Sequence, residues 1–93
     1  MPIIHYTYIL KCSDGSFYVG STANLKNRVK KHNQGKGVAH TAKRRPVKSV
    51  YHEKFRNLND AVKRERQVKR WSKAKKEALI SGEIETLQKL SKS

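Results

Sequence analysis

A tight turn between two strand-like segments constrains this chain more than any other feature of its sequence. Residues 5–11 and 17–22 are rich in Tyr, Thr, Val and Ile, the residue types that favour strands. Residues 13–16 between them read Ser-Asp-Gly-Ser, which is a strong hairpin signal. The sequence therefore predicts an antiparallel hairpin, and both of its strands carry tyrosine.

The length of the turn decides whether these tyrosines can act together. A two-residue Asp-Gly loop would pair Leu10 with Val19 and send Tyr8 and Tyr18 to opposite faces, because side chains alternate along a strand. A three-residue loop, with Gly15 in the left-handed position of a β-bulge, would pair Leu10 with Tyr18 and put both tyrosines on one face. A shared site needs the second register, which we predict.

The rest of the chain predicts a single α/β (α+β) domain, because 93 residues leave little room for a second folding unit. Its core is expected over residues 4–82, with a helical tail over 83–93. The predicted elements are a third strand over 47–55, helices over 22–33, 57–71 and 72–82, and a loop over 34–46. The residues expected to cap these helices are Thr22 or Asn24, then Asn57 with Asp60, then Ser72.

Positive charge dominates the composition, with 22 Lys and Arg against 7 Asp and Glu and a net charge of +15. Such an excess repels itself unless a polyanion relieves it, and a nucleic acid offers a regular row of phosphates. A solvated basic surface on a protein with an unrelated role is the plainer interpretation. We predict a nucleic-acid partner, with DNA as the first candidate and RNA as the second.

Other classes of protein fit the sequence poorly. The first ten residues, MPIIHYTYIL, lack a basic start and a long apolar core, so a signal peptide is not expected. No apolar run approaches the roughly 20 residues that cross a bilayer, so no membrane contact is expected. The single cysteine, Cys12, cannot form an internal disulfide and suits a reducing cytoplasm. We expect Cys12 to be structural rather than nucleophilic.

Three polar side chains fall where helical periodicity predicts apolar ones. Leu25 and Val29 define an inward stripe on the first helix, and Arg28 and His32 lie on that stripe. Glu65 lies in the middle of the apolar stripe of the second helix. Because an unpaired buried charge is costly, each should face a polar cleft or a partner. A buried ion pair between Arg28 and Glu65 and a functional site are equally compatible with the spacing.

Glu65 is also a candidate ligand for a metal ion. A single carboxylate in a basic cleft can hold one divalent cation, Mg²⁺ or Mn²⁺, through waters and substrate phosphates. No second carboxylate stands at a compatible spacing, which argues against a two-metal site. The four histidines show no zinc-binding spacing.

Taken together, these residues resemble the GIY-YIG nuclease family, and in particular its small standalone members of the UPF0213 type. The resemblance rests on Tyr8, the Tyr-Val-Gly run at residues 18–20, Arg28 ten residues after Tyr18, and the helical Glu65. It runs from about residue 5 to beyond residue 71. It implies a three-stranded antiparallel sheet flanked by helices, and hydrolysis of phosphodiester bonds with one divalent metal ion.

The resemblance also implies roles for these residues. Tyr8 or Tyr18 would help to deprotonate the attacking water, Arg28 would stabilise the phosphate, and Glu65 would anchor the metal ion. His32 matches a position for proton transfer or phosphate contact, and His40 is a further match of that kind. The expected phosphate contacts come from basic residues along the chain: Lys43, Arg44, Arg45, Lys63, Arg64, Arg66, Lys69, Arg70, Lys73, Lys75 and Lys76.

The chain departs from the family pattern at three places. Tyr6 and Thr7 replace the Gly and Ile of the family name, and Ser21 follows Tyr-Val-Gly where some relatives have Lys. Many relatives carry an Asn after the metal-binding Glu, whereas here no Asn follows Asn59. The leading hypothesis is a metal-dependent endonuclease that acts on unusual DNA structures or with weak sequence specificity, as a monomer or as a dimer on its substrate. One alternative is a nucleic-acid-binding protein that cuts little or nothing. Another is a basic structural protein, which predicts a paired Glu65 far from the tyrosines.

Overall fold

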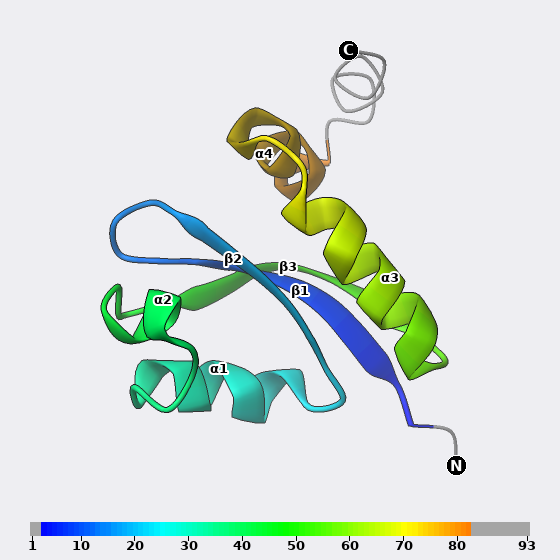
Figure 1. The fold of residues 1–93 in the computed structure, drawn as a ribbon, viewed down its shortest axis with the longest axis horizontal. Helices are drawn as coiled ribbons and strands as arrows, with labels where there is room; N and C mark the ends of the chain where they lie inside the picture. Colours follow the sequence, from blue (N-terminus) through cyan, green and yellow to red (C-terminus); the bar gives the residue numbers. More distant parts are fainter. Residues whose placement is uncertain (1–2, 83–93) are drawn as a thin grey trace.

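The hairpin predicted from the turn is the framework of the domain (Figure 1). The computed structural model describes residues 3–82 of the chain. The elements in chain order are β1 (His5–Lys11), β2 (Phe17–Thr22), α1 (Leu25–Asn33), α2 (Ala39–Ala42), β3 (Lys48–Phe55), α3 (Leu58–Lys69) and α4 (Lys73–Ser81). The three strands form one antiparallel sheet in the order β2-β1-β3, so β1 is central and β2 is an edge strand. The predicted three-stranded antiparallel fold is confirmed.

The structure also confirms the predicted register. Leu10 pairs with Tyr18, and Tyr8 pairs with Gly20. The backbone N–H of Gly15 donates to the Cys12 carbonyl at 3.0 Å, and Gly15 has a φ of 84°. That conformation favours glycine and closes a three-residue loop. Tyr8 and Tyr18 therefore lie on the same face of the sheet.

Each face of the sheet carries its own apolar core. One core gathers Tyr8, Leu10, Cys12 and Val47 beneath Leu25 and Val29 of α1. The other gathers Ile9, Val19 and Val68, with Trp71, Leu79 and Ile80 packed against it from α3, α4 and the segment that joins them. Helix α1 therefore covers one face of the sheet, while α3 and α4 cover the other (Figure 1). Cys12 is buried in the first core, as a structural residue would be.

The helix caps follow the sequence closely. The side chains of Asn24, Asn57 and Ser72 each accept a hydrogen bond from a backbone N–H of the first turn, which stabilises the start of α1, α3 and α4. Gly82 ends α4 in the left-handed conformation, with a φ of 76°.

Several predicted boundaries are wrong by a few residues. Helix α1 begins at Leu25 rather than at Thr22, because Thr22 still belongs to β2 and its hydroxyl accepts from the Asn24 N–H. The predicted loop over 34–46 contains the short helix α2. β3 begins at Lys48 rather than 47, and α3 ends at Lys69 rather than near 71. The helical turns predicted over 83–90 lie outside the described residues.

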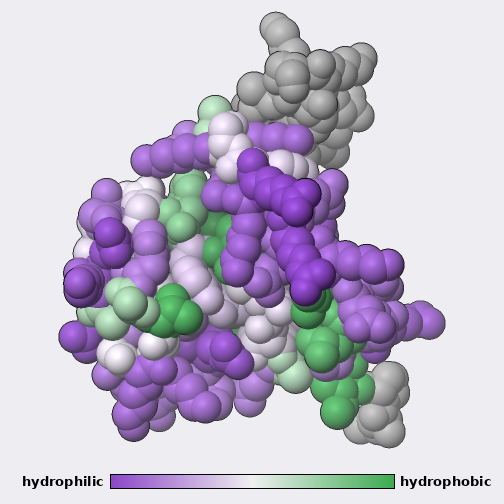
Figure 2. Space-filling model, in the orientation of Figure 1, coloured by the Kyte–Doolittle hydropathy of each residue, from purple (hydrophilic) through white to green (hydrophobic). Residues whose placement is uncertain are grey.

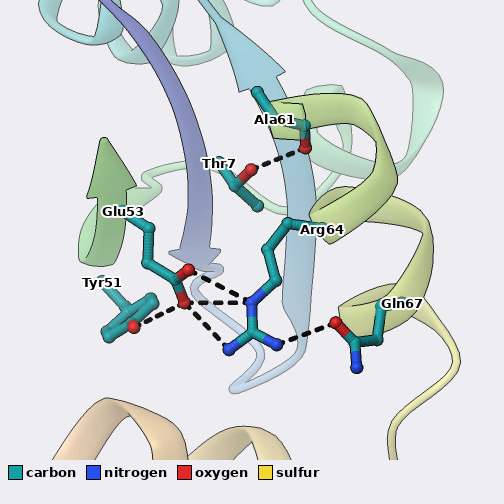
Figure 3. A network of polar contacts seen from close by, with 6 residues as sticks. All are labelled: Thr7, Tyr51, Glu53, Ala61, Arg64 and Gln67. Atoms are coloured by element: carbon teal, nitrogen blue, oxygen red, sulfur yellow. Dashed lines mark hydrogen bonds and ion pairs between the residues drawn. The ribbon is translucent and has the colours of Figure 1, made fainter. Parts of the chain in front are cut away.

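A polar network fastens α3 to the sheet (Figure 3). Arg64 Nε donates to both Glu53 oxygens, at 3.2 and 3.1 Å, and Nη1 donates to Gln67 Oε1 at 2.9 Å. The Tyr51 hydroxyl donates to Glu53 Oε2 at 2.7 Å. Thr7 Oγ1 donates to the carbonyl of Ala61 at 2.7 Å, so a buried hydroxyl ties β1 directly to α3. The network fixes α3 against the face of the sheet that it covers.

The surface is mainly polar. Hydrophilic residues cover most of the face drawn in Figure 2. Among residues 3–82, no helix is long and apolar enough to cross a membrane.

Candidate active site at the edge strand

Tyr8 is the buried centre of the candidate site. Its side chain is 1% exposed, and its ring lies 6.4 Å from the ring of Tyr18, measured between centroids. The Tyr8 hydroxyl reaches across β2 at Gly20, where a Cβ atom would stand only 2.5 Å from the hydroxyl oxygen. A glycine is therefore required at this position of the edge strand, because any side chain would displace the phenol. The prediction that the two tyrosines share one face is confirmed.

His32 lies against Tyr8, and its hydrogen bonds fix which nitrogen carries the proton. His32 Nδ1 is 2.7 Å from Thr41 Oγ1, and that hydroxyl donates to the Val38 carbonyl at 3.1 Å. A hydroxyl has only one proton to donate, so the short contact requires the hydrogen to be on His32 Nδ1. Nε2 then offers a lone pair, and it lies 3.4 Å from the Tyr8 hydroxyl. Tyr8 therefore donates to His32 across a long hydrogen bond.

The environments of these two groups keep both of them neutral. Burial raises the pKa of the Tyr8 phenol above its ordinary value of 10.0, the neighbouring Tyr18 and Glu65 raise it further, and the positive charge of Arg28 opposes them. Burial lowers the pKa of His32 from 6.5, and Arg28 lowers it further. A protonated phenol thus faces an unprotonated imidazole, so Tyr8 can donate a proton that His32 can accept.

The rings of Tyr18 and His40 complete the cluster. The ring centroid of Tyr18 lies 5.1 Å from that of His32 and 6.3 Å from that of His40. His40 Nε2 lies 3.2 Å from Ser16 Oγ, and that hydroxyl donates to Asp14 Oδ1 at 2.6 Å. The tip of the hairpin therefore holds His40 in place beside Tyr18.

Arg28 stands at the rim of the site. It is exposed but lines a cleft with His32, which agrees with the prediction that a charged residue on this stripe of α1 faces a polar cleft or a partner. The long Arg side chain can leave an apolar stripe and reach solvent at its end. Arg28 lines an open cleft of about 340 Å³ together with Tyr18, His32 and Lys31. The guanidinium thus faces the cleft in which a phosphate could lie.

Glu65 approaches the site from the opposite face of the sheet. Ser21 Oγ donates to Glu65 Oε1 at 2.6 Å, and Lys69 Nζ pairs with Oε2 at 2.8 Å. Gly20 and Ser21 are neighbours on the edge strand and point to opposite faces, so the Tyr8 hydroxyl and the Glu65 carboxylate lie on opposite faces at adjacent residues of β2. The effect of Glu65 on the pKa of Tyr8 reflects this closeness.

This arrangement decides between the interpretations of Glu65. Among residues 3–82, no ion pair joins Arg28 and Glu65, so the buried pair between α1 and α3 is not formed. Glu65 is paired, as the structural-protein alternative predicts, but its partner is Lys69 on its own helix and its charge still acts on Tyr8. The carboxylate side chain remains 18% exposed.

Glu65 is the side chain of the site that could hold a divalent cation. Within the described residues, no three His, Cys, Asp or Glu side chains gather closely enough to hold a metal ion by themselves. Glu65 supplies one partly exposed carboxylate, and Lys69, whose side chain is 48% exposed, can swing away from it. A cation held by one carboxylate completes its shell with waters and phosphate oxygens, as Mg²⁺ commonly does.

The basic residues predicted to contact phosphates divide into two groups. Several are tied to other parts of the protein: Arg44 pairs with Asp14 at 2.8 Å, Arg45 donates to the Ala42 carbonyl at 2.9 Å, and Arg64 is held by Glu53. Lys75 lies over the Trp71 ring at 4.2 Å, and Lys76 is half-buried. The other members, Lys43, Lys63, Arg66, Lys69, Arg70 and Lys73, are exposed to solvent, and Lys69 pairs with Glu65.

Sequence reasoning missed four residues that shape this site. Thr41 fixes the tautomer of His32, and Ser21 orients Glu65. Lys31 lines the cleft beside Arg28. Gly37 packs so closely on the His32 ring that a Cβ atom there would overlap it. The position of Lys31 next to the predicted His32 is a signal that could have identified it.

The fold and the site define a basic α/β domain with a phenol, an imidazole, a guanidinium and a carboxylate gathered at a sheet edge. A family model described as the GIY-YIG catalytic domain matches residues 4–78 of the chain. The chain therefore belongs to the GIY-YIG family, as the sequence motifs predict. Membership in this nuclease family implies a nucleic-acid substrate.

Similar proteins agree with this assignment. A UPF0213 protein of Staphylococcus saprophyticus is 48% identical over 77 residues, which cover 83% of this chain and 94% of that protein. A UPF0213 protein of Bacillus pumilus is 46% identical over 76 residues, covering 82% and 78% respectively.

Two solution NMR structures also resemble the fold. That of a UPF0213 protein from Bacillus halodurans has a TM-score of 0.54 at 44% identity and covers 84% of this chain and 83% of that chain. That of a protein from E. faecalis has a TM-score of 0.57 at 40% identity, covering 87% and 88%.

Proposed function

We propose that the protein is a metal-dependent endonuclease that hydrolyses phosphodiester bonds in DNA, directed by DNA structure or by weak sequence preference. Such an activity would suit DNA repair or recombination in the cytoplasm. The observation that carries the proposal is the pairing of Tyr8 with His32 beside Arg28 and Glu65 at the free edge of β2. A protein that only binds nucleic acid has no need for a carboxylate beside its phosphate site, because a carboxylate repels phosphate.

The proton path supports Tyr8 rather than Tyr18 as the group that activates water. The Tyr8 hydroxyl already donates toward the free lone pair of His32 Nε2. As Tyr8 takes a proton from the attacking water, its own proton can pass to His32, so no phenolate has to form in isolation. This coupling matters because burial makes the phenolate of Tyr8 unfavourable.

The phosphate side of the reaction falls to the basic residues of α1. Arg28 can donate two parallel hydrogen bonds to phosphate oxygens, and Lys31 adds a second positive charge to the same cleft. Glu65 would hold one Mg²⁺ or Mn²⁺ ion, which would neutralise charge on the scissile phosphate and its leaving oxygen. Lys69 would release the carboxylate when the ion binds.

Nicking of supercoiled plasmid and of branched DNA in Mg²⁺ or Mn²⁺ tests the proposal. The double variant Arg28→Ala with Glu65→Gln should lose at least about 100-fold in rate, because it removes charge stabilisation of the transition state. Arg56→Ala is a matched control, since Arg56 is an exposed arginine in the connection between β3 and α3. Nicking that survives the double variant would come from a contaminant and would overturn the proposal.

One observation favours binding without cleavage as the second candidate. Both oxygens of Glu65 are already engaged, by Ser21 and by Lys69. If Lys69 is not displaced, no ion binds and the domain acts as a basic clamp on DNA or RNA. Binding with a steep salt dependence, but with no nicking in either metal, would select this candidate.

A further inference from the structure

A second and larger hollow lies on the other side of α1 from the cleft. Its volume is about 640 Å³, and it runs between α1 and β3. Leu25 and Val29 of α1 line this groove, whereas Arg28 and Lys31 of the same helix line the cleft. Helix α1 is therefore a ridge between the two hollows.

An aromatic pair forms the wall of the groove. Tyr6 and His52 contact edge to face, with ring centroids 5.7 Å apart and planes at 73°. Both side chains line the groove, Tyr6 half-buried and His52 exposed. Tyr6 stands at the position where the family motif has glycine, so this chain carries a ring there that the motif does not require.

Positive charge surrounds the aromatic pair and continues along the ridge. Lys54 lies opposite Tyr6 in the ladder between β1 and β3, and both Lys54 and Lys26 line the groove and are exposed. Lys30 and Lys31 carry the charge along α1 toward the cleft. A helix with its side chains is about 10–12 Å across, so a few nucleotides can cross the ridge from the groove to the cleft.

We propose that this groove binds an unpaired nucleotide of the nucleic-acid substrate, with its base against Tyr6 and His52 and its phosphates on Lys26 and Lys54. Aromatic side chains beside a basic track are the means by which proteins hold single strands without reading sequence. A strand that leaves the groove crosses α1 and enters the cleft at Arg28. The proposal rests on the proposed function for its choice of substrate, and it names junctions between duplex and single strand as the preferred structure.

Fluorescence anisotropy compares a blunt DNA duplex with the same duplex carrying a single-stranded tail, in the absence of divalent metal. The unaltered protein should bind the tailed duplex several-fold more tightly, since base stacking on an aromatic side chain contributes about 1–3 kcal/mol per base, or roughly 5- to 150-fold. The double variant Tyr6→Leu with His52→Ala should lose that preference and keep its affinity for the blunt duplex. Quenching of 2-aminopurine in the tail should disappear in the same variant.

Two controls separate stacking from folding and from general charge. Tyr6→Phe keeps the ring and should keep the preference for the tail. Lys48→Ala removes an exposed lysine from β3 outside the groove and should leave the preference unchanged. His52→Ala alone, at an exposed position, should reduce the preference even if Tyr6→Leu does not fold.

The outcomes also distinguish this proposal from the proposed function. If the preference for the tail persists in the double variant, or is absent from the unaltered protein, the groove does not bind the strand. Nicking in the same samples would still support the proposed nuclease function. Competition by a free mononucleotide as strong as by the tail would make the groove a nucleotide pocket and overturn the role for a strand. If the preference for the tail is intact but no nicking occurs in Mg²⁺ or Mn²⁺, the proposed nuclease function is overturned and the role of the groove in strand binding is kept. A parallel arm with a tailed RNA duplex shows which nucleic acid supplies the strand.

Discussion

The two faces of the sheet use similar residues in opposite ways. On the face covered by α3, Tyr51 and Arg64 both bind Glu53, and Arg64 also stacks on Trp71 at 5.0 Å. On the face covered by α1, Tyr8 has a long hydrogen bond to His32 and lies beside an open cleft. The hydrogen bond of Tyr51 stabilises the fold, whereas that of Tyr8 can shorten or transfer a proton.

This difference shows what marks a functional polar group in this domain. Both tyrosines have a raised pKa, that of Tyr51 to about 12 because of burial and its hydrogen bond to Glu53. A perturbed pKa alone therefore does not separate structure from chemistry. What separates them is the partner: Tyr51 donates to a carboxylate that an arginine already neutralises, whereas Tyr8 donates to a neutral base.

The largest effect on the nicking rate is expected from a side chain at Gly20, where the Tyr8 hydroxyl crosses the edge strand. Gly20→Ala would place a methyl group 2.5 Å from the Tyr8 hydroxyl and push the phenol away from His32. The nicking rate should fall by about 100-fold or more, the range of a lost general base. Circular dichroism should show that the sheet is kept. Normal nicking by a folded Gly20→Ala protein would contradict the role of this contact.

A change on the α3 face should affect stability instead. Glu53→Gln leaves Arg64 half-buried with a neutral partner, which should lower the free energy of unfolding by about 1.5–3 kcal/mol, the typical contribution of a hydrogen bond to a charged group. Urea unfolding measures the loss, and the nicking rate per folded molecule should stay the same. A loss of rate without a loss of stability would show that both faces take part in the chemistry.

A smaller effect on the nicking rate is expected when the hydrogen bond that keeps the proton on His32 Nδ1 is removed. Thr41→Val keeps the shape of a fully buried side chain but removes the oxygen that accepts from Nδ1. We expect about a tenfold lower rate, or roughly 1.4 kcal/mol in the barrier. Thr41→Ser restores the hydroxyl and should restore the rate. If Thr41→Val and the unaltered protein share one pH–rate profile, Thr41 is only a packing residue.

The pH dependence gives the mildest test. The pKa of His32 is lower in the folded state than its ordinary 6.5, so the unfolded state binds more protons between the two values and stability rises with pH across that window. As the proton acceptor, His32 must be neutral, so the rate should decline only at pH values below 6.5. An acidic limb centred above pH 6.5 would show that the acceptor is another group.

Local chemistry explains what the sequence could predict. The turn residues and Gly15 specify the hairpin register, and Asn24, Asn57 and Ser72 specify helix starts, because each acts on its own neighbours. Helix α2 was missed because it spans four residues and Val38 before it provides no side-chain cap. A segment that short shows no helical periodicity.

The site was predicted less completely, because tertiary contacts decide it. Periodicity placed Arg28 on the stripe of Leu25 but could not show that its long side chain ends at the rim. The contact between Thr41 and His32 joins α2 to α1, and nothing near either residue in the sequence indicates it. Whether Glu65 pairs with Arg28 depended on α1 and α3 covering opposite faces of the sheet, which no spacing within one helix reveals.

One matched pair of variants tests the contrast between the faces most directly. Tyr8→Phe and Tyr51→Phe each remove one hydroxyl from a tyrosine of the sheet, one on each face. In a single-turnover nicking assay, Tyr8→Phe should lose at least about 100-fold in rate and little stability, because its hydroxyl lies on the proton path. Tyr51→Phe should keep the rate and lose about 1 kcal/mol of stability. Equal rates for the two variants would contradict the account.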